Sequence, residues 1–330
     1  MVAYTGIQGQ NILIVSSDPA NPVEGQIWYN STSNLLKGYQ RVVVNAAWAS
    51  GGNLNTARTQ RGGAGTQTAA LGAGGYVSGS SPYNTTAVET YNGTSWTSRT
   101  SLNSDVRGNQ VAGGTNTASL SFLGVQGNST FTAQTESWNG SSWTIVNSLN
   151  LQRSSAGSAG TQTAALAFGG YFPPPNRNNS ESWNGTSWTN TPTLNTIVSG
   201  SAGAGTQTAA LSFGGGGGNP GTPTAQTEIW NGSSWTIGSS MNTARFSLAG
   251  FGIQTAAVAA GGQPNSNATE LYNGTSWSSS PANLTTARGD LGGTGTQSLG
   301  LVYGGLPFST ATEEWTGPST ALQTKTITTS

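Results

Sequence analysis

A tryptophan recurs along this chain at nearly constant spacing. It occupies positions 48, 96, 143, 188, 235 and 277, at intervals of 48, 47, 45, 47 and 42 residues. The last five end the same sequence motif, Asn-Gly-Thr/Ser-Ser-Trp. A fixed period of about 40 to 50 residues is typical of propellers and solenoids, in which each repeat is one supersecondary unit. We therefore expect a repeat fold and not an ordinary two-domain protein.

The composition favours an all-β protein. Of the 330 residues, 34% are hydrophobic and only 7% are charged, and there are 49 glycines. Low charge with many small polar residues and large aromatics suits short strands joined by tight turns. Disorder is disfavoured because the aromatics recur in register and disorder usually goes with high charge.

The unit from Arg153 to Asn190 shows the pattern within one repeat. A pair of glycines stops the second strand, and Asn184-Gly185 lies between the third and fourth. Asn-Gly predicts a type I′ hairpin turn, which needs positive φ at both central residues. Four antiparallel strands in about 45 residues make one propeller blade. The four expected strands are 153–160, 161–168, 181–183 and 186–189.

Six such units can be counted. The Gly-Gly pairs fall at 74–75, 169–170, 214–215, 261–262 and 304–305, and Phe122-Leu123-Gly124 departs from the pattern in the remaining slot. A glutamate opens each third strand, at 89, 136, 181, 228, 270 and 313. We therefore predict a six-bladed β-propeller with four antiparallel strands per blade.

The two ends of the repeat region must combine to complete the sixth blade. The last unit lacks its Asn-Gly-Thr-Ser-Trp strand, whereas residues 41–49 precede the first unit without a blade of their own. We favour closure by 41–49, which removes exposed sheet edges. Residues 325–329 also alternate and form the rival closing strand. The expected domains are a short N-terminal attachment segment, 1–40, and the propeller, 41–330.

Composition excludes several chemistries. The chain has no His and no Cys, so imidazole and thiol catalysis and the usual zinc sites are absent. The formal net charge is zero, which gives nucleic-acid binding little support. The apolar stretch Ile12 to Val15 is too short for a membrane span. We predict a non-enzymatic protein with no cofactor, no metal, no nucleic-acid partner and no membrane insertion.

The repeat resembles the kelch family of β-propellers. The resemblance rests on Gly-Gly after the second strand, an aromatic after Glu in the third and Trp in the fourth, and it covers roughly residues 41–316. Blade two departs at its Gly-Gly element, and Val198 in blade four stands where other units have Arg.

The repeat sequence also resembles that of virion proteins of marine and cyanobacterial tailed bacteriophages, which are tail fibres or decoration proteins. It is carried by Leu-Asn-Thr-Ala-Arg, Ala-Gly-Thr-Gln-Thr-Ala-Ala-Leu and Thr-Glu-Ser-Trp-Asn-Gly-Ser-Ser-Trp-Thr, and by the opening run from Asp18 to Gly38. The resemblance implies a virion protein, made in the host cytoplasm and carried on the extracellular particle.

Half of the charged residues occupy recurrent positions of the repeat. We expect the arginines and glutamates to form a clamp between blades, with a ring of arginines that binds an anion or acidic glycan as the alternative. The tryptophans are expected in the core between blades, with sugar-stacking platforms as the alternative. These structural repeat residues are Arg58, Arg107, Arg153, Arg245, Arg288, Glu89, Glu136, Glu181, Glu228, Glu270, Glu313, Trp96, Trp143, Trp188, Trp235 and Trp277.

The loops between second and third strands differ most among units. Antiparallel alternation places them on one face with the Leu-Asn-Thr-Ala-Arg linkers, while turn chemistry explains the nearly identical Thr-Gln-Thr and Asn-Gly turns of the other face. Insertions of repeat folds commonly lie on the binding face. These loops could bind a ligand, or they could simply close over the blades. The ligand-binding candidates are Tyr76, Tyr83, Phe131, Tyr171, Phe172, Arg177 and Phe308.

These expectations combine into one function with two alternatives. We expect a virion structural protein that residues 1–40 hold to other virion proteins and that could be multimeric on the particle. Its propeller would present the loop face to a host surface receptor such as a glycan. The first alternative is a purely structural capsid or tail decoration that contacts other virion proteins. The second is a carbohydrate-active enzyme, which would need paired carboxylates.

Overall fold

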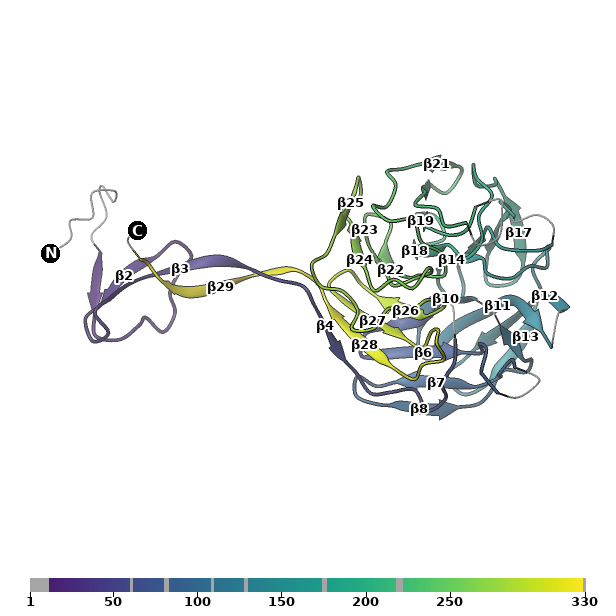
Figure 1. Cartoon of the computed structure of the whole chain (residues 1–330), viewed down its shortest axis with the longest axis horizontal. Coiled ribbons are helices and arrows are strands. Elements are labelled where there is room, and N and C mark those ends of the chain that lie inside the picture. Colours follow the sequence, from purple (N-terminus) through teal and green to yellow (C-terminus); the bar gives the residue numbers. More distant parts are fainter. Residues whose placement is uncertain are drawn as a thin grey trace. The chain divides into compact units, whose positions relative to one another are not determined.

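The computed structural model is all-β, and its described residues contain no helix. It describes residues 12–59, 62–79, 83–107, 110–127, 130–173, 177–217 and 222–328, without the side chains of 106–113. The chain divides into two compact units (Figure 1). The first comprises Met1–Asn45 and Pro318–Ser330, and the second comprises Ala46–Gly317.

The first unit holds one four-stranded sheet in the order β1-β2-β3-β29. Its strands are β1 (Leu13–Val15), β2 (Ile27–Asn30), β3 (Leu35–Val44) and β29 (Ser319–Thr326). Strand β1 pairs parallel with β2, and the other pairs are antiparallel. The expected boundary between residues 40 and 41 is therefore displaced, because β3 continues to Val44 and the chain's last strand pairs with it.

The second unit holds six sheets, named here the first to sixth ring sheets. The first contains β5 (Ala64–Thr66), β6 (Ala69–Ala73), β7 (Val88–Tyr91) and β8 (Trp96–Arg99). The second contains β10 (Gln110–Thr115), β11 (Ala118–Gln126), β12 (Thr130–Trp138) and β13 (Trp143–Val146), with β9 (Val106–Arg107) paired to β11. The third contains β14 (Gly157–Gly160), β15 (Ala165–Phe168), β16 (Ser180–Trp183) and β17 (Trp188–Thr191).

The remaining ring sheets repeat this order. The fourth contains β18 (Ala202–Gly205), β19 (Ala210–Phe213), β20 (Thr227–Trp230) and β21 (Trp235–Ile237). The fifth contains β22 (Ala249–Ile253), β23 (Ala256–Ala260), β24 (Thr269–Tyr272) and β25 (Trp277–Ser279). The sixth contains β26 (Gly292–Gly295), β27 (Leu299–Tyr303), β28 (Thr312–Thr316) and β4 (Ala47–Ser50).

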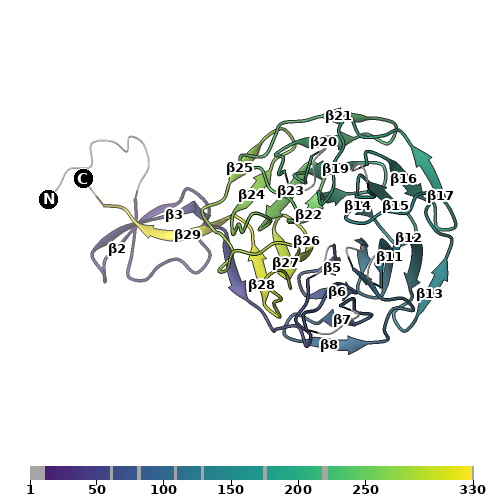
Figure 2. The same ribbon diagram turned by 45° about the vertical axis from the view of Figure 1, so that its right-hand side comes forward.

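The ring sheets follow one another around a central axis (Figure 2). The first strand of each lies beside the first strand of the next, and β26 returns to β5. Strand β4 pairs with β28, so the N-terminal side of the chain supplies the fourth strand of the sixth ring sheet. The rival strand at 325–329 does not take this place, because β29 pairs with β3. The described residues thus form seven sheets, not the expected six, and the arrangement is consistent with a β-propeller.

The innermost strands contain small residues because they approach one another closely. A Cβ placed on Gly203 of β18 would lie 2.1 Å from the carbonyl oxygen of Ser158 in β14. A Cβ on Gly250 of β22 would lie 2.6 Å from the Cβ of Ala202. No side chain larger than hydrogen fits at such distances, so the Ala-Gly wording of these strands follows from the packing of neighbouring sheets.

The Asn-Gly hairpins differ from the expected type I′ turn. Gly185 has φ of 93°, but Asn184 is not among the residues with positive φ. The connecting loop has four residues, since Trp183 pairs with Trp188. Asn184 Oδ1 accepts hydrogen bonds from the backbone N–H groups of Thr186 and Ser187, at 2.9 Å each. The asparagine is therefore selected for its side-chain acceptor and not for a left-handed backbone.

The second ring sheet has the same backbone conformation as its neighbours, although its sequence differs at the Gly-Gly position. Leu123 takes the position of the first glycine in the Gly-Gly pairs, with φ of 64° against 62° for Gly169. Leu123 is buried with 1% exposure. The second ring sheet thus keeps a strained left-handed residue that places a large apolar side chain in the core. The variable loop expected between the second and third strands is here largely replaced by strand, because β11 continues to Gln126 and β12 begins at Thr130.

The recurrent tryptophans lie in the core between adjacent ring sheets. Trp96, Trp143, Trp188, Trp235 and Trp277 have 5–6% exposure. Most also form a hydrogen bond to the preceding ring sheet. Trp188 Nε1 donates to Thr135 Oγ1 at 3.0 Å, and Trp277 Nε1 donates to Thr227 Oγ1 at 3.0 Å. The acceptor is the threonine that directly precedes the third-strand glutamate.

Two tryptophans lack this acceptor. Val88 takes the threonine position opposite Trp143, and the buried Nε1 of Trp143 has no partner. Ser180 takes it opposite Trp235, where the indole nitrogen and the serine hydroxyl are both unpaired. A buried donor without an acceptor costs free energy, so these positions weaken two sheet-to-sheet contacts.

We expect Val88→Thr to stabilise the protein, because the new hydroxyl supplies the missing acceptor for Trp143. A net hydrogen bond contributes about 0.5–1.5 kcal/mol to the free energy of unfolding. Thr135→Val is the matched control, and it should cost about 1–3 kcal/mol because it leaves Trp188 Nε1 unpaired. Denaturant unfolding monitored by Trp fluorescence measures both. Equal losses in the two variants would show that the indole hydrogen bond is not what distinguishes these positions.

Candidate functional site

The linker that enters each ring sheet is held by the glutamate of that sheet's third strand. Glu89 Oε1 accepts a hydrogen bond from Arg58 Nη1 at 2.9 Å. Glu89 Oε2 accepts from the backbone N–H and the side-chain amide of Asn55, both at 2.7 Å. The same ion pair joins Arg153 to Glu181 at 2.6 Å, Arg245 to Glu270 at 2.9 Å and Arg288 to Glu313 at 2.7 Å.

The main chain of the same linker is bonded to the preceding ring sheet. Leu54 N–H donates to Thr310 O at 2.8 Å, and Gly305 N–H donates to Arg58 O at 3.0 Å. Both partners lie in the loop between β27 and β28. Each linker is therefore fixed on one side by backbone hydrogen bonds and on the other by a buried carboxylate, and it joins two sheets as the expected clamp does.

The clamp arginines are not available to an external anion. Arg58, Arg153, Arg245 and Arg288 have 0–1% exposure. Removal from water lowers the pKa of each guanidinium, and the paired glutamate opposes that shift. An arginine ring that binds an acidic glycan needs solvent access, so this geometry favours the clamp. The side chain of Arg107 lies outside the described residues.

One ring sheet keeps the clamp without its arginine. Val198 O still accepts the backbone hydrogen bond of Gly170, at 2.8 Å. Glu228 has 2% exposure and accepts from Thr196 Oγ1 at 2.5 Å and from the backbone and side chain of Asn195. Hydroxyl and amide donors thus satisfy a carboxylate that elsewhere receives a guanidinium.

We expect Arg153→Met to destabilise the second unit by about 3–5 kcal/mol, because it leaves Glu181 buried without its counter-ion. Equilibrium unfolding followed by Trp fluorescence measures the loss. Arg41→Met is the control, since Arg41 and Glu24 form an exposed pair at 2.9 Å. An exposed pair contributes only about 0–1 kcal/mol. A comparably small effect of Arg153→Met would contradict the structural role of the buried pair.

On the face that holds the Thr-Gln-Thr turns, glutamine side chains form hydrogen bonds between neighbouring ring sheets. Gln67 Nε2 donates to Trp315 O at 2.7 Å in the preceding ring sheet, and Gln297 Nε2 donates to Tyr272 O at 2.7 Å. Gln162, Gln207 and Gln254 make the corresponding bonds. The expectation that turn chemistry alone explains Thr-Gln-Thr is therefore wrong. The glutamine that recurs in five of the six units was the signal, because a hairpin turn does not require it.

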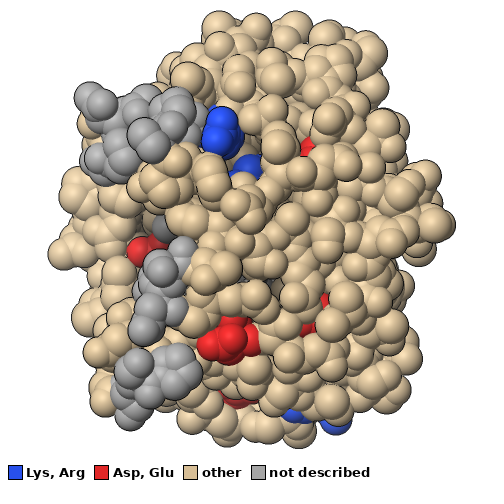
Figure 3. Space-filling view, turned by 90° about the vertical axis from the view of Figure 1, so that its right-hand side faces the viewer, with Lys and Arg blue, Asp and Glu red and all other residues tan. Residues whose placement is uncertain are grey.

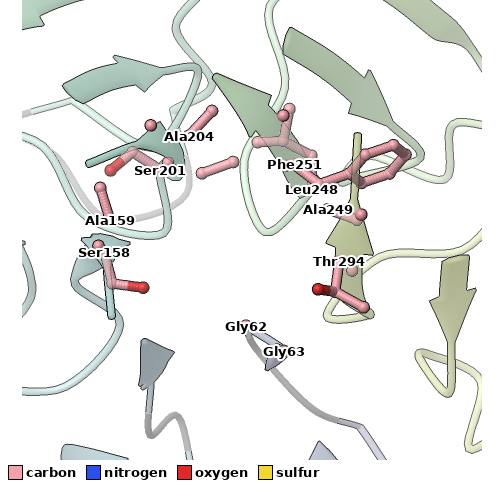
Figure 4. A pocket seen from close by; sticks show the side chains of 18 of the residues that line it. Gly62, Gly63, Ser158, Ala159, Ser201, Ala204, Leu248, Ala249, Phe251 and Thr294 are labelled. Atoms are coloured by element: carbon pink, nitrogen blue, oxygen red, sulfur yellow. The ribbon is translucent and has the colours of Figure 1, made fainter. Parts of the chain in front are cut away.

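The innermost strands enclose a cavity of about 210 Å³. Glycine, alanine and serine predominate in its wall, and no charged residue lines it in the part that the structure describes. Figure 4 shows the hydroxyls of Ser158 and Thr294 pointing toward this space. Thr294 Oγ1 donates to Gly65 O at 2.7 Å, so one of the two hydroxyls is already engaged. The polar groups that the described residues offer to the cavity are main-chain and hydroxyl groups, beside the apolar side chains of Leu248 and Phe251.

Three of the predicted ligand-binding residues form one group, named here the first aromatic cluster. The rings of Tyr76 and Tyr83 lie 5.5 Å apart, and those of Tyr76 and Phe308 lie 5.5 Å apart. The cluster joins the loops of the first and sixth ring sheets. Tyr83 is the most open of the three, with 39% exposure, and the other two are half-buried.

The other four form the second aromatic cluster. The ring of Phe131 lies 5.8 Å from Tyr171 and 5.1 Å from Phe172, and the guanidinium of Arg177 lies 5.3 Å from the Phe172 centroid. This cluster joins the second and third ring sheets, and all four side chains are half-buried. Such tilted and edge-to-face aromatic pairs contribute about 0.5–1.5 kcal/mol beyond area burial, so the loops also support one another.

An asparagine between the clusters was not predicted from the sequence. Asn84 Nδ2 donates to Val125 O at 2.9 Å and to Gly127 O at 2.8 Å, which ties the first loop to the β11–β12 hairpin. The loops of the sixth, first, second and third ring sheets are thereby joined in one continuous arc. Nothing in the wording around Asn84 distinguishes it from other loop asparagines.

The repeat does not require the aromatics. Tyr76 and Tyr171 directly follow their Gly-Gly pairs and bridge to Thr59 and Ser154. In the fourth and fifth ring sheets, Gly216 and Gln263 occupy the same slot and make the same backbone bridges. The fold therefore requires only a backbone bridge at this position and does not restrict which residue type occupies it.

On the face of the molecule in Figure 3, Lys, Arg, Asp and Glu atoms are few and scattered. Among the described residues, no group of three or more His, Cys, Asp or Glu side chains could hold a metal ion. The described part of the chain also has no helix long and apolar enough to cross a membrane.

Comparison with protein-family models found no match, and comparison with curated proteins found no significant match.

Proposed function

We propose that this chain is a non-enzymatic binding protein whose second unit is a six-bladed, kelch-like β-propeller. The six ring sheets, the Gly-Gly stops and the glutamate-anchored linkers support this architecture. The non-enzymatic part rests on the repeat glutamates, because they are buried and hydrogen-bonded within the clamp. A glycosidase would need two carboxylates facing a substrate.

The two aromatic clusters carry the proposal. They gather large, partly exposed rings on the loop arc of four ring sheets, where the repeat itself needs no aromatic. Rigid aromatic side chains anchor interfaces at low entropy cost. A glycan fits such a surface, because sugar rings stack on aromatic faces. We infer that the loop arc binds a glycan on a host surface.

The virion assignment extends this proposal. It rests on the resemblance of the repeat wording and of residues Asp18–Gly38 to virion proteins of tailed bacteriophages. In this role the first unit attaches the protein to other virion proteins, and the loop arc faces the host.

A second candidate function is a purely structural decoration of the particle. One observation favours it: the aromatic rings pack against each other in tilted pairs, which closes the loops over the ring sheets. The two functions differ in what the exposed edges of the rings contact, a host glycan or a neighbouring virion protein.

We expect the combined change of Tyr83, Phe131, Tyr171 and Phe172 to Ser to abolish glycan binding while the ring stays folded, because none of the four lies within the buried core. The full chain and the variant are compared on a glycan array. The matched control changes Ile145, Ile237 and Ile253 to Ser, since these exposed side chains lie outside the loop arc.

A particle assay separates the two candidates. Normal incorporation with lost host adsorption supports the receptor role, whereas lost incorporation supports the decoration role. If neither changes and the array shows no difference between the full chain and the loop variant, the loop arc does not have the proposed role.

A further inference from the structure

Strand β29 is an open edge of the sheet in the first unit. It pairs with β3 along one side, from Ser319 opposite Val44 to Thr326 opposite Lys37. Along its other side, no strand of the described chain is paired with it. Alternate residues of β29 therefore direct both a backbone N–H and a C=O away from β3, which is a template for a further strand.

This edge has only one of the usual protections against strand addition, a single lysine near its end. Proteins blunt edge strands with short length, prolines, bulges or charged side chains, lysine above all. Strand β29 has eight residues, Ser-Thr-Ala-Leu-Gln-Thr-Lys-Thr, with Lys325 as its one charge and no proline. Seven of the eight residues are exposed. The opposite edge differs, because β1 has only three residues.

Large exposed apolar side chains also gather in this unit. Val43 has 72% exposure and pairs with Thr320, and Leu322 has 37% exposure and pairs with Arg41. Arg41 is bonded to Glu24 at 2.9 Å, so its charge is locally balanced. On this face of β29 an approaching strand therefore meets Leu322 between Thr320 and Thr324, next to the balanced charge of Arg41.

We propose that β29 pairs antiparallel with β29 of a second copy of this chain, about a two-fold axis at Leu322. Strand addition to an exposed edge is an established mode of recognition, and a two-fold axis makes the contact self-complementary. This inference is independent of the loop arc and of any glycan.

The residues of β29 favour this register. Directly opposed residues share a face, so a two-fold axis must pass through a residue position. With the axis at Leu322, the two leucines face each other, and Thr320 faces Thr324 of the second copy. Lys325 then faces Ser319, so no like charges are opposed. An axis at Gln323 would instead oppose two glutamines and place Leu322 against Thr324.

The absence of cysteine from the chain makes the register directly testable. Opposed Cα atoms in an antiparallel pair lie about 4.5–5.5 Å apart, within the roughly 4.4–6.8 Å that a disulfide spans. We expect the Leu322→Cys variant of the full chain to form a disulfide-linked dimer under mild oxidation. The product is read on a non-reducing gel.

Gln323→Cys is the matched control. The side chain is also exposed, but in this register the two copies of residue 323 lie about 8 Å apart and cannot be bridged. Cross-linking should be at least about tenfold slower than for Leu322→Cys, because the bond then requires a displaced register. Equal rates for the two variants would overturn the proposed pairing.

Sedimentation of the unmodified chain gives a second readout. We expect a concentration-dependent dimer that Leu322→Lys weakens by about tenfold or more, because two lysines then face each other at the axis. Ile237→Lys is the control, at an exposed position of the second unit with 64% exposure, and should leave the dimer intact. The proposal would be overturned if the unmodified chain stayed monomeric or formed a trimer. It would also be overturned if the Leu322→Lys variant dimerised as well as the unmodified chain.

Discussion

The buried glutamate of each third strand is the contact on which the ring depends. It fixes the linker's side chains to the sheet ahead, while the linker's main chain is bonded to the sheet behind, as Arg58 shows with Glu89 on one side and Gly305 on the other. A sheet with one apolar face and open edges cannot stay alone in water. The linker therefore converts a row of similar sheets into a ring whose members are held at constant spacing.

Two positions that depart from the repeat, Val198 and Leu123, indicate which parts of the linker contact the ring requires. Val198 keeps the carbonyl contact to Gly170 and loses the guanidinium, and Thr196 supplies a donor to Glu228 instead. Leu123 keeps the left-handed backbone of the glycine that it replaces. In both cases the main-chain geometry persists while the side chain varies. The backbone part of the contact is thus the stricter requirement, and a buried carboxylate accepts any adequate set of donors.

Sequence reasoning succeeded where the signal was periodic. The recurrence of Glu, Gly-Gly and Trp indicated an all-β repeat of four-stranded antiparallel sheets, and the Trp side chains lie between sheets as that recurrence suggested. It failed where pairing was unique or distant. Strand β29 pairs with β3 across nearly the whole chain, and no repeat signals it. Gln67 was misread because the turn already explained its neighbours, and its amide reaches a carbonyl in another sheet.

The same packing that holds the loops also shapes what they can bind. The fourth and fifth ring sheets show that the slot after Gly-Gly needs only a backbone bridge, so Tyr76 and Tyr171 are additions to the fold. Their rings rest on partners from a neighbouring sheet, which restricts their rotamers before any ligand arrives. Half-burial therefore does not weaken the binding interpretation. A ring fixed on one side loses less conformational entropy when its open side is covered than a freely rotating ring would.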